Sequence, residues 1–336
     1  MQITTVGFDL AKNVFQVHAI DACEKVLIQK QLRRAQVLPF FAKLAPCLIG
    51  MEACASAHYW AREIKKLGHD VRLMPAKDVK AYVKRSKNDA VDAAACCEAV
   101  RRPTVRTVPV KAPDQQASLM QHRVRDLLVR QRTQTINALR AHMAEFGIIA
   151  PQGYDGLKTL LSIIADCSDP RLPDDAHASL SALIAQIASC QAEIGAIEKR
   201  LLTQHRKNED SKRLKTIPGI GVIGASAIVA TIPDATIFKT GRDFAAWIGI
   251  VPREDSTGGK QRLGPISKQG DQYLRRLLII GALAVLKQAR AHPDKYPWLT
   301  QLLERKPAKV AAVALANKMA RIAWAVLSKK ESYRAQ

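Results

Sequence analysis

The first 105 residues alternate short apolar runs with stretches that favour helices, and this alternation constrains the fold more than any other feature of the chain. The β-prone runs are Ile3–Phe8, Val14–Ile20, Cys47–Met51 and Val71–Met74. The helix-forming stretches are Ser56–Leu67 and Asn88–Val100. Because a strand must bury its apolar face and interposed helices can cover it, this order predicts an α/β layer fold. The second run is expected to be the hairpin partner of the first.

Apolar residues recur at alternating spacings of three and four near the middle of the chain, which is the heptad pattern of a helix with one apolar seam. The seam comprises Leu180, Leu183, Ile187, Cys190, Ile194, Ile197 and Leu201. An earlier helix-forming stretch, Gln115–Glu145, is a candidate partner. We therefore expect a helical arm or an antiparallel coiled coil. The spacing allows the seam to close within one chain or between two chains.

The last third of the chain combines helix-forming stretches with one long loop rich in glycine, lysine and arginine. The helices are expected at Val222–Thr231, Gln272–Arg290 and Ala308–Ser328, and the loop at Pro252–Gly270. This pattern predicts a mostly α-helical unit. We accordingly expect three domains: an α/β domain at 1–108, a helical coiled-coil linker or dimerisation arm at 109–206, and a C-terminal domain at 207–336.

The charge balance of the chain is strongly basic, with a net charge of +22. An excess of this size favours a polyanionic partner, and nucleic acid above others, because each neutralised phosphate releases counterions. The seven cysteines are odd in number and form no C-x-x-C pair, so neither a disulfide framework nor a zinc site is expected. With no signal-peptide pattern and no uncharged apolar stretch of ~20 residues, we expect a soluble intracellular protein.

Four carboxylates stand where they could share a metal ion. Asp9 ends the first strand, and Glu52 follows the run Cys47–Met51. Asp89 and Asp92 are three residues apart, so they share one face of a helix. Strand ends converge at one edge of an α/β sheet, and a helix packed there can add its own acids. Oxygen-only ligands suit Mg²⁺ or Mn²⁺, and two such ions can clamp the oxygens of a phosphoryl transfer.

Each of these acids also has an ordinary explanation, because an aspartate after a strand is often a cap and an i,i+3 pair is usually a solvated face. Taken together, the four acids favour a metal site. Asp9 and Glu52 each end an apolar run, where a buried charge needs a partner. Two more acids on a neighbouring helix would repel them unless a cation were bound.

Ser256 lies in a basic, glycine-containing segment, Val251–Arg262. Adjacent glycines let backbone N–H groups approach a phosphate, and nearby cations can bind its oxygens. The cations are Arg253, Lys260 and Arg262, with Lys268 beyond them. A serine hydroxyl needs a base or a metal to become a nucleophile, so composition alone favours a phosphate-binding loop over covalent chemistry. The spacing of a P-loop is absent.

A second basic feature precedes the paired aspartates. Positive side chains recur at helical spacing and would form one basic stripe that leads to the carboxylates. The residues are Lys77, Lys80, Lys84 and Lys87, with Arg85 beside them. The alternative is an ordinary solvated helix face. Four positive charges on one face repel one another unless a polyanion is bound, which favours nucleic acid.

Three segments resemble the DEDD transposases of the insertion-sequence one-ten family. They are Gly7–Lys12 (GFDLAK), the Met-Glu-Ala segment at 51–53, and the KNDAVDA segment at 87–93. The sequence around Glu52 most resembles that of the eleven-eleven subgroup. The resemblance implies an RNase H-like domain similar to that of RuvC-type Holliday-junction resolvases, with Asp9, Glu52, Asp89 and Asp92 as catalytic metal ligands. It spans nearly the whole chain.

The resemblance also extends to the C-terminal loop, including Ile266–Gly270, and it changes the reading of the serine. In that family a serine attacks DNA and forms a phosphoserine link. Motif position assigns this role to Ser256, with Thr257 and Ser267 as competing assignments. The family further implies strand exchange between donor and target DNA, a non-coding bridge RNA that pairs with both, and assembly into homodimers and homotetramers. A prokaryotic, cytoplasmic and nucleoid-associated location follows from the same resemblance.

Three rival functions remain open at this point. A hydrolytic RuvC-like nuclease or junction resolvase needs the four acids but no Ser256. A non-enzymatic RNA- or DNA-binding scaffold would use only the helical arm and the basic patches. A sugar-kinase-like ATPase shares a loose likeness to GFDLAK, but the charge of +22 and the missing further phosphate loops oppose it. In the favoured hypothesis, two protomers build a composite site and the heptad helix dimerises them.

Overall fold

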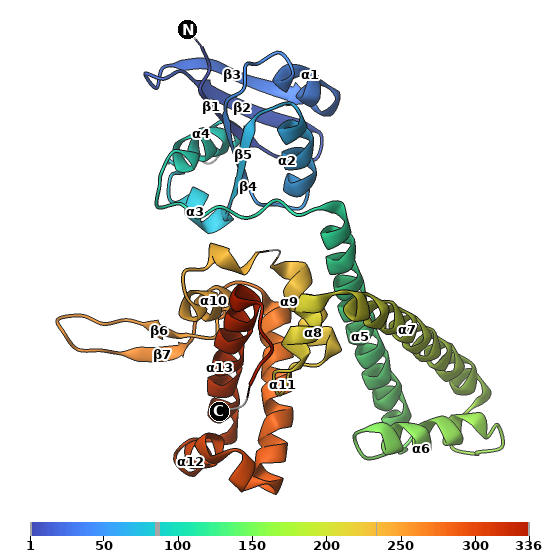
Figure 1. Cartoon of the computed structure of the whole chain (residues 1–336). Helices are drawn as coiled ribbons and strands as arrows, with labels where there is room; N and C mark the ends of the chain where they lie inside the picture. Colours follow the sequence, from blue (N-terminus) through green and yellow to red (C-terminus); the bar gives the residue numbers. More distant parts are fainter. Residues whose placement is uncertain (1, 85–87, 233, 335–336) are drawn as a thin grey trace. The chain divides into compact units, whose positions relative to one another are not determined.

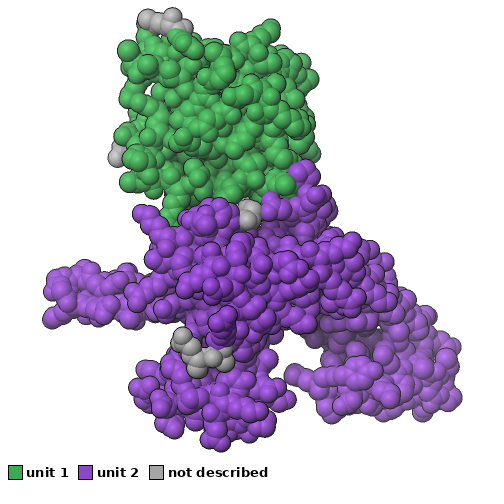
Figure 2. Space-filling view, viewed as in Figure 1, with its two compact units in different colours: residues 1–112 green, residues 113–336 purple. Residues whose placement is uncertain are grey.

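The computed structural model describes residues 2–84, 88–232 and 234–334. The chain divides into two compact units, residues 1–112 and 113–336, which Figure 2 shows in separate colours. The predicted helical arm and the C-terminal helices both lie in the second unit.

The first unit is built on a five-stranded mixed sheet with the strand order β3-β2-β1-β4-β5 (Figure 1). β1 pairs with β2 and β2 with β3 in antiparallel fashion, whereas β4 and β5 run parallel to β1. The strands are β1 Thr5–Asp9, β2 Val14–Ile20, β3 Val26–Arg33, β4 Leu48–Glu52 and β5 Asp70–Met74. The predicted α/β layer fold and the predicted hairpin are therefore confirmed.

Successive residues of β1 point to opposite faces of the sheet, and this alternation separates two helical layers. Val6 and Phe8 are fully buried in a cluster that includes residues of α1 (Val37–Phe41) and α2 (Ala57–Lys66). Gly7, between them, faces α4 (Asp89–Val100) on the other side. The short helix α3 (Ala76–Lys80) packs beside α4.

Strand β3 is absent from the sequence-based expectation, and its side chains explain why. Of its eight residues, Leu32 alone is buried, while the others are exposed or half-buried. An edge strand needs no alternating apolar pattern, because its stability comes from the ladder with β2. The period-two signal that reveals inner strands is therefore missing here.

The second unit begins with two long helices that pack against each other, α5 (Pro113–Glu145) and α7 (Asp174–Lys207), joined by α6 (Tyr154–Ala165). Arg125 of α5 pairs with Glu198 of α7 at 2.6 Å. The heptad seam is buried within this single chain at Leu180, Ile187, Cys190, Ile194, Ile197 and Leu201. Of the two possibilities left by the spacing, the structure shows closure within one chain.

The remaining helices of this unit surround a core rich in alanine and large aliphatic residues. They are α8 Glu209–Lys215, α9 Val222–Thr231, α10 Gly241–Ile248, α11 Gln272–Ala291, α12 Pro297–Arg305 and α13 Ala308–Lys329, with short 3₁₀ turns between some of them. The long loop expected at Pro252–Gly270 is in part a β-hairpin. Its strands are β6 (Pro252–Glu254) and β7 (Leu263–Ile266), which pair in antiparallel fashion (Figure 1).

By length and composition, α7 and α13 are the two described helices that could cross a membrane. Neither helix is an uncharged run of ~20 residues, because charged side chains such as Glu193 in α7 and Lys318 in α13 interrupt them. Both helices contribute buried residues to the folded protein, among them Leu201 in α7 and Ala316 and Ala320 in α13. The apolar faces of packed helices meet the same criterion of length and hydropathy.

Candidate active site

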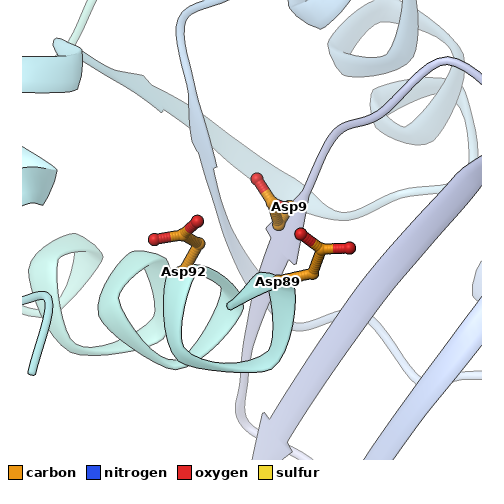
Figure 3. A group of neighbouring side chains, drawn as sticks. All are labelled: Asp9, Asp89 and Asp92. Atoms are coloured by element: carbon orange, nitrogen blue, oxygen red, sulfur yellow. The ribbon is translucent and has the colours of Figure 1, made fainter. Parts of the chain in front are cut away.

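Three of the four predicted carboxylates meet at one edge of the first unit. Ligand oxygens of Asp9, Asp89 and Asp92 all lie within 4.8 Å of one another. Figure 3 shows Asp9 at the end of its strand, with Asp89 and Asp92 on the first turn of the adjacent helix. Asp9 and Asp92 are half-buried, whereas Asp89 is exposed. An ion at this point would be reached by three oxygens and would remain open to solvent on one side.

Two glycines explain why α4 can come close enough to bring its acids to the sheet. A Cβ on Gly7 would lie 2.0 Å from the carbonyl oxygen of Ala93. A Cβ on Gly50, the partner of Gly7 in the parallel β1–β4 ladder, would lie 2.6 Å from the Cβ of Val100. The helix backbone therefore lies directly on these two strands, a distance that no other residue type permits without movement.

The fourth acid, Glu52, sits two residues beyond Gly50, as Asp9 sits two residues beyond Gly7. The two acids therefore end neighbouring parallel strands. Glu52 does not belong to the described group whose ligand oxygens lie within 4.8 Å. Its charge is nevertheless near enough to contribute to the raised pKa of Asp9. The structure thus brings three predicted residues together and leaves the fourth at the margin.

The cluster brings several negatively charged carboxylates close together. Burial raises the pKa of Asp9 from 3.8 to about 6, and the negative charges of Asp92, Asp89 and Glu52 act in the same direction. The Leu10 backbone N–H opposes the rise by donating to the carboxylate. A bound cation would remove this repulsion, because an opposite charge favours the ionised carboxylate.

The N-terminus of α4 reduces the cost of holding the other two acids. The side chain of Asn88 caps the helix by accepting a hydrogen bond from the Val91 N–H at 2.9 Å. Asp89 and Asp92 both lie in the first turn, where the helix dipole favours negative charge. The helix therefore presents two carboxylates in a position that stabilises it.

A buried thiol behind the cluster bears on the choice of metal. Cys96 is 1% exposed, and burial together with the charges of Asp9 and Glu52 raises its pKa far above the ordinary value. Cys96 is not among the described residues whose ligand atoms meet at the site, which are all carboxylates. The donor set at the site is oxygen, which fits Mg²⁺ or Mn²⁺.

Ser256 lies in the turn region of the β6–β7 hairpin, and its hydroxyl is already oriented. The Oγ donates a hydrogen bond to Oε1 of Glu254 at 3.0 Å and accepts one from the Arg262 N–H at 3.2 Å. Glu254 also accepts a bond from the side chain of Gln261 at 3.4 Å. Among the described hydroxyls of Ser256, Thr257 and Ser267, that of Ser256 alone donates to a carboxylate. Such a partner can take the proton when the oxygen attacks.

Four cations surround this hairpin. Within the described residues none of them forms a salt bridge, and all four are exposed. They are the predicted nucleic-acid contacts Arg253, Lys260, Arg262 and Lys268. Gly258 and Gly259 both have positive φ, of 56° and 76°, which gives the turn its tight reversal. The result is an exposed, basic turn that carries one hydroxyl with an acidic neighbour.

The predicted basic stripe before the aspartates is wrong as a single helix. Helix α3 ends at Lys80, so Lys77 and Lys80 are helical and exposed, whereas Lys84 lies beyond the helix. Arg85 and Lys87 fall outside the described residues. The chain leaves the helix through a turn at residues 81 and 82. A spacing of three and four between basic residues therefore does not by itself extend α3 beyond its five residues. Most helical stability in proteins comes from the packing of an apolar face.

Two features of the site were not predicted from the sequence. The sequence-based prediction gave Gly7 and Gly50 no role. Each glycine lies two residues before the acid that ends its strand, and a glycine inside a strand often marks a place where another segment of backbone comes close. Glu254 has no recognisable role in a segment expected to be a loop, because its contact with Ser256 depends on the β6–β7 hairpin. The alternation of a β-strand and the turn that follows it places both side chains together.

Comparison with known proteins gives two family matches. The model described as "Transposase IS116/IS110/IS902 family" matches residues 211–297, and a model of the DEDD transposase domain of the IS110 type matches residues 6–148. The first contains the serine hairpin, and the second contains the acidic cluster.

Full-length relatives give the same picture. The chain is 50% identical over 336 residues to a probable family 20 transposase of Pseudomonas aeruginosa, with 99% of both chains covered. It is 40% identical to the transposase for insertion sequence element IS1328 of Yersinia enterocolitica, with 96% of both covered. It is 38% identical to the transposase for element IS1111A of Coxiella burnetii, covering 99% of this chain and 92% of that one.

Proposed function

The chain belongs to the IS116/IS110/IS902 family of transposases, and we propose that it cleaves DNA strands with the hydroxyl of Ser256, supported by a divalent cation held by its acidic cluster. The family membership makes it an enzyme that cuts and rejoins DNA at an insertion sequence. The match to the DEDD transposase domain, which is RNase H-like, covers residues 6–148 and so includes nearly all of the first unit with its mixed five-stranded sheet.

The acidic cluster is the observation that carries the metal-dependent part of the proposal. Asp9, Asp89 and Asp92 would hold the cation through their carboxylates, and Glu52 would complete the set from the neighbouring strand end. A divalent ion held there would supply positive charge that stabilises the phosphorane-like transition state. Gly7 and Gly50 act through position alone, because they let the helix bring its acids to the strand ends.

Ser256 supplies the attacking oxygen. Its Oγ forms a bond to the phosphorus of a DNA phosphodiester, and the bond between that phosphorus and one deoxyribose oxygen breaks. The hydroxyl proton passes to Glu254, and the protonated Glu254 returns it to the leaving sugar oxygen. The product is a phosphodiester between serine and DNA, so the reverse attack by a DNA hydroxyl rejoins a strand without any outside source of energy.

The exposed cations position nucleic acid for this attack. Arg253, Lys260, Arg262 and Lys268 bind backbone phosphates around the hairpin, and Lys77, Lys80 and Lys84 do so on the first unit, with Arg85 and Lys87 as further contacts. We also propose a non-coding bridge RNA as guide, which the net charge of +22 would suit, and assembly into homodimers or homotetramers.

Trapping a covalent intermediate tests the proposal. The full-length protein is incubated with Mg²⁺, the DNA ends of its own element and RNA transcribed from the flanking non-coding segment. Protein–DNA adducts are then digested and mapped by mass spectrometry. The expected adduct is on Ser256, and it is lost in Ser256→Ala but kept in the matched variants Thr257→Ala and Ser267→Ala. Asp9→Asn is expected to abolish it as well.

Three results would each refute a part of this assignment. An adduct on Thr257 or Ser267 would show that this residue, and not Ser256, is the nucleophile. Metal-dependent cutting that persists in Ser256→Ala and leaves ends made by water would instead establish hydrolysis, the chemistry of a junction resolvase. Adduct formation that is unchanged in Asp9→Asn would remove the metal cluster from the mechanism.

A further inference from the structure

The second unit contains an open cleft of about 730 Å³ that the proposed chemistry does not use. It is lined by the start of α10, by α12 and by one face of α13. The residues that matter here are Thr240, Arg242, Trp298, Lys318 and Arg321. Three of these five are cations, and among the described lining residues there is no aspartate or glutamate.

The packing of α10 on α13 builds the cleft. A Cβ on Gly241, the first residue of α10, would lie 3.1 Å from both the Cα and the carbonyl oxygen of Arg321, so the helix starts in close contact with α13. A capping box between Thr240 and Asp243 fixes this start. In this capping box, Asp243 accepts hydrogen bonds from the Thr240 N–H and from the Thr240 hydroxyl, each at 3.1 Å. The carboxylate of Asp243 is therefore engaged at the helix start.

The three cations are held together without a protein counter-charge. Arg242, Lys318 and Arg321 are all exposed, and within the described part of the chain none of them forms a salt bridge. Lys318 and Arg321 are three residues apart on α13 and therefore share one face. Like charges gathered in one concave site raise the local positive potential and favour an anion.

An exposed aromatic ring stands beside these charges. Trp298 follows the proline that starts α12 and is 42% exposed, and the Lys318 ammonium lies 4.4 Å from its ring centroid. The other tryptophan of the cleft, Trp324, is half-buried and donates its indole N–H to the carbonyls of Ala235 and Phe238. Trp324 is therefore a wall of the cleft, whereas Trp298 is the exposed ring, with the Lys318 ammonium over one of its faces.

We propose that this cleft binds an unpaired nucleotide of a nucleic-acid strand, with the base stacked on Trp298 and the flanking phosphates held by Arg242 and Arg321. An aromatic platform next to a basic groove is the combination by which proteins bind single strands. A paired base inside a duplex cannot present its face to a side chain, so the site selects unpaired or extruded nucleotides. The inference rests on the nucleic-acid substrate of the proposed function but not on the acidic cluster or on Ser256.

Photo-crosslinking tests the stacking partner. The full-length protein is mixed in EDTA with short single-stranded oligonucleotides that carry 5-iodouracil, one set of RNA and one of DNA, and irradiated. We expect a crosslink on Trp298, retained in part by Trp298→Phe, and about tenfold weaker binding in Trp298→Ala. The matched control is Trp247→Phe, since Trp247 is 36% exposed but does not line the cleft. The arm that binds more tightly identifies RNA or DNA as the source of the nucleotide.

Salt titrations test the phosphate contacts. Arg242→Gln with Arg321→Gln is expected to reduce the slope of log affinity against log salt by about 1.4, at ~0.7 for each contact to a single strand. The control pair Lys287→Gln with Lys309→Gln removes the same charge from exposed positions outside the cleft. Equal losses in both pairs, a crosslink that maps elsewhere, or a blunt duplex that competes as well as a single strand would overturn the proposal. Because no metal is present, failure here leaves the cleavage mechanism standing.

Discussion

Replacing Asp9 by asparagine should stabilise the metal-free first unit while it abolishes metal binding. In the folded protein the pKa of Asp9 is raised from 3.8 to about 6, first by burial and then by the charges of Asp92 and Asp89. A carboxyl group with a raised folded-state pKa holds its proton more tightly than in the unfolded chain. Ionising it at neutral pH therefore costs folding free energy, and the asparagine side chain carries no such cost.

The magnitude follows from the two pKa values. A rise of about two units at ~1.4 kcal/mol per unit gives a penalty of about 3 kcal/mol as an upper value, and solvent screening of this half-buried carboxylate lowers the actual penalty. The size of this penalty depends on pH. Well below pH 4 both states are protonated and the penalty is absent. It grows as the pH rises from about 4 to about 6, where the unfolded chain has lost the proton and the folded one has not. Above pH 6 it is complete.

Hydrogen exchange of the β1 and β4 amides measures this locally. In EDTA at pH 8, Asp9→Asn should raise their protection, after correction for intrinsic rates, by up to about a hundredfold. At pH 4 the two proteins should nearly coincide. Adding Mg²⁺ should protect the wild-type strands and leave the variant unchanged. Asp78→Asn, a half-buried acid on α3, serves as the matched control. Lower protection in Asp9→Asn at pH 8 would refute the like-charge account of the cluster.

Three further changes test other parts of the structure. Gly7→Ala places a methyl group 2.0 Å from the Ala93 carbonyl oxygen, so it should destabilise the first unit by about 1–3 kcal/mol and weaken Mn²⁺ binding in a calorimetric titration; unchanged affinity would disprove the close-packing argument. Glu254→Gln should slow formation of the Ser256 adduct by at least about a hundredfold with metal affinity unchanged, and a rate within threefold of wild type would exclude Glu254 as the base. His122 is 1% exposed and burial lowers its pKa from 6.5 to about 4, so exchange protection in α5 should fall as the pH drops from about 6.5 to 4, and His122→Gln should flatten this dependence.

Much of the first unit could be predicted from the sequence. Inner strands carry the period-two or continuous apolar runs that local patterning reveals, and β2 was placed at its observed bounds. Asp9 and Glu52 could be assigned to strand ends for the same reason. Edge strand β3 could not, since Leu32 is its one buried residue. The hairpin β6–β7 was missed because a strand of three exposed residues has no pattern to read.

Residue order alone determined which side chains end a strand, which share a helix face, and which family the motifs belong to, because these properties depend on neighbours within a few positions. The tertiary structure decided which of them meet. It placed Asp89 and Asp92 beside Asp9 through the contact of α4 with Gly7, and it left Glu52 outside the compact trio. It also closed the heptad seam within one chain and gathered cations from α10 and α13 into one cleft. Such meetings depend on the packing of whole elements, where a change of one methyl group at a glycine decides how close two backbones can come.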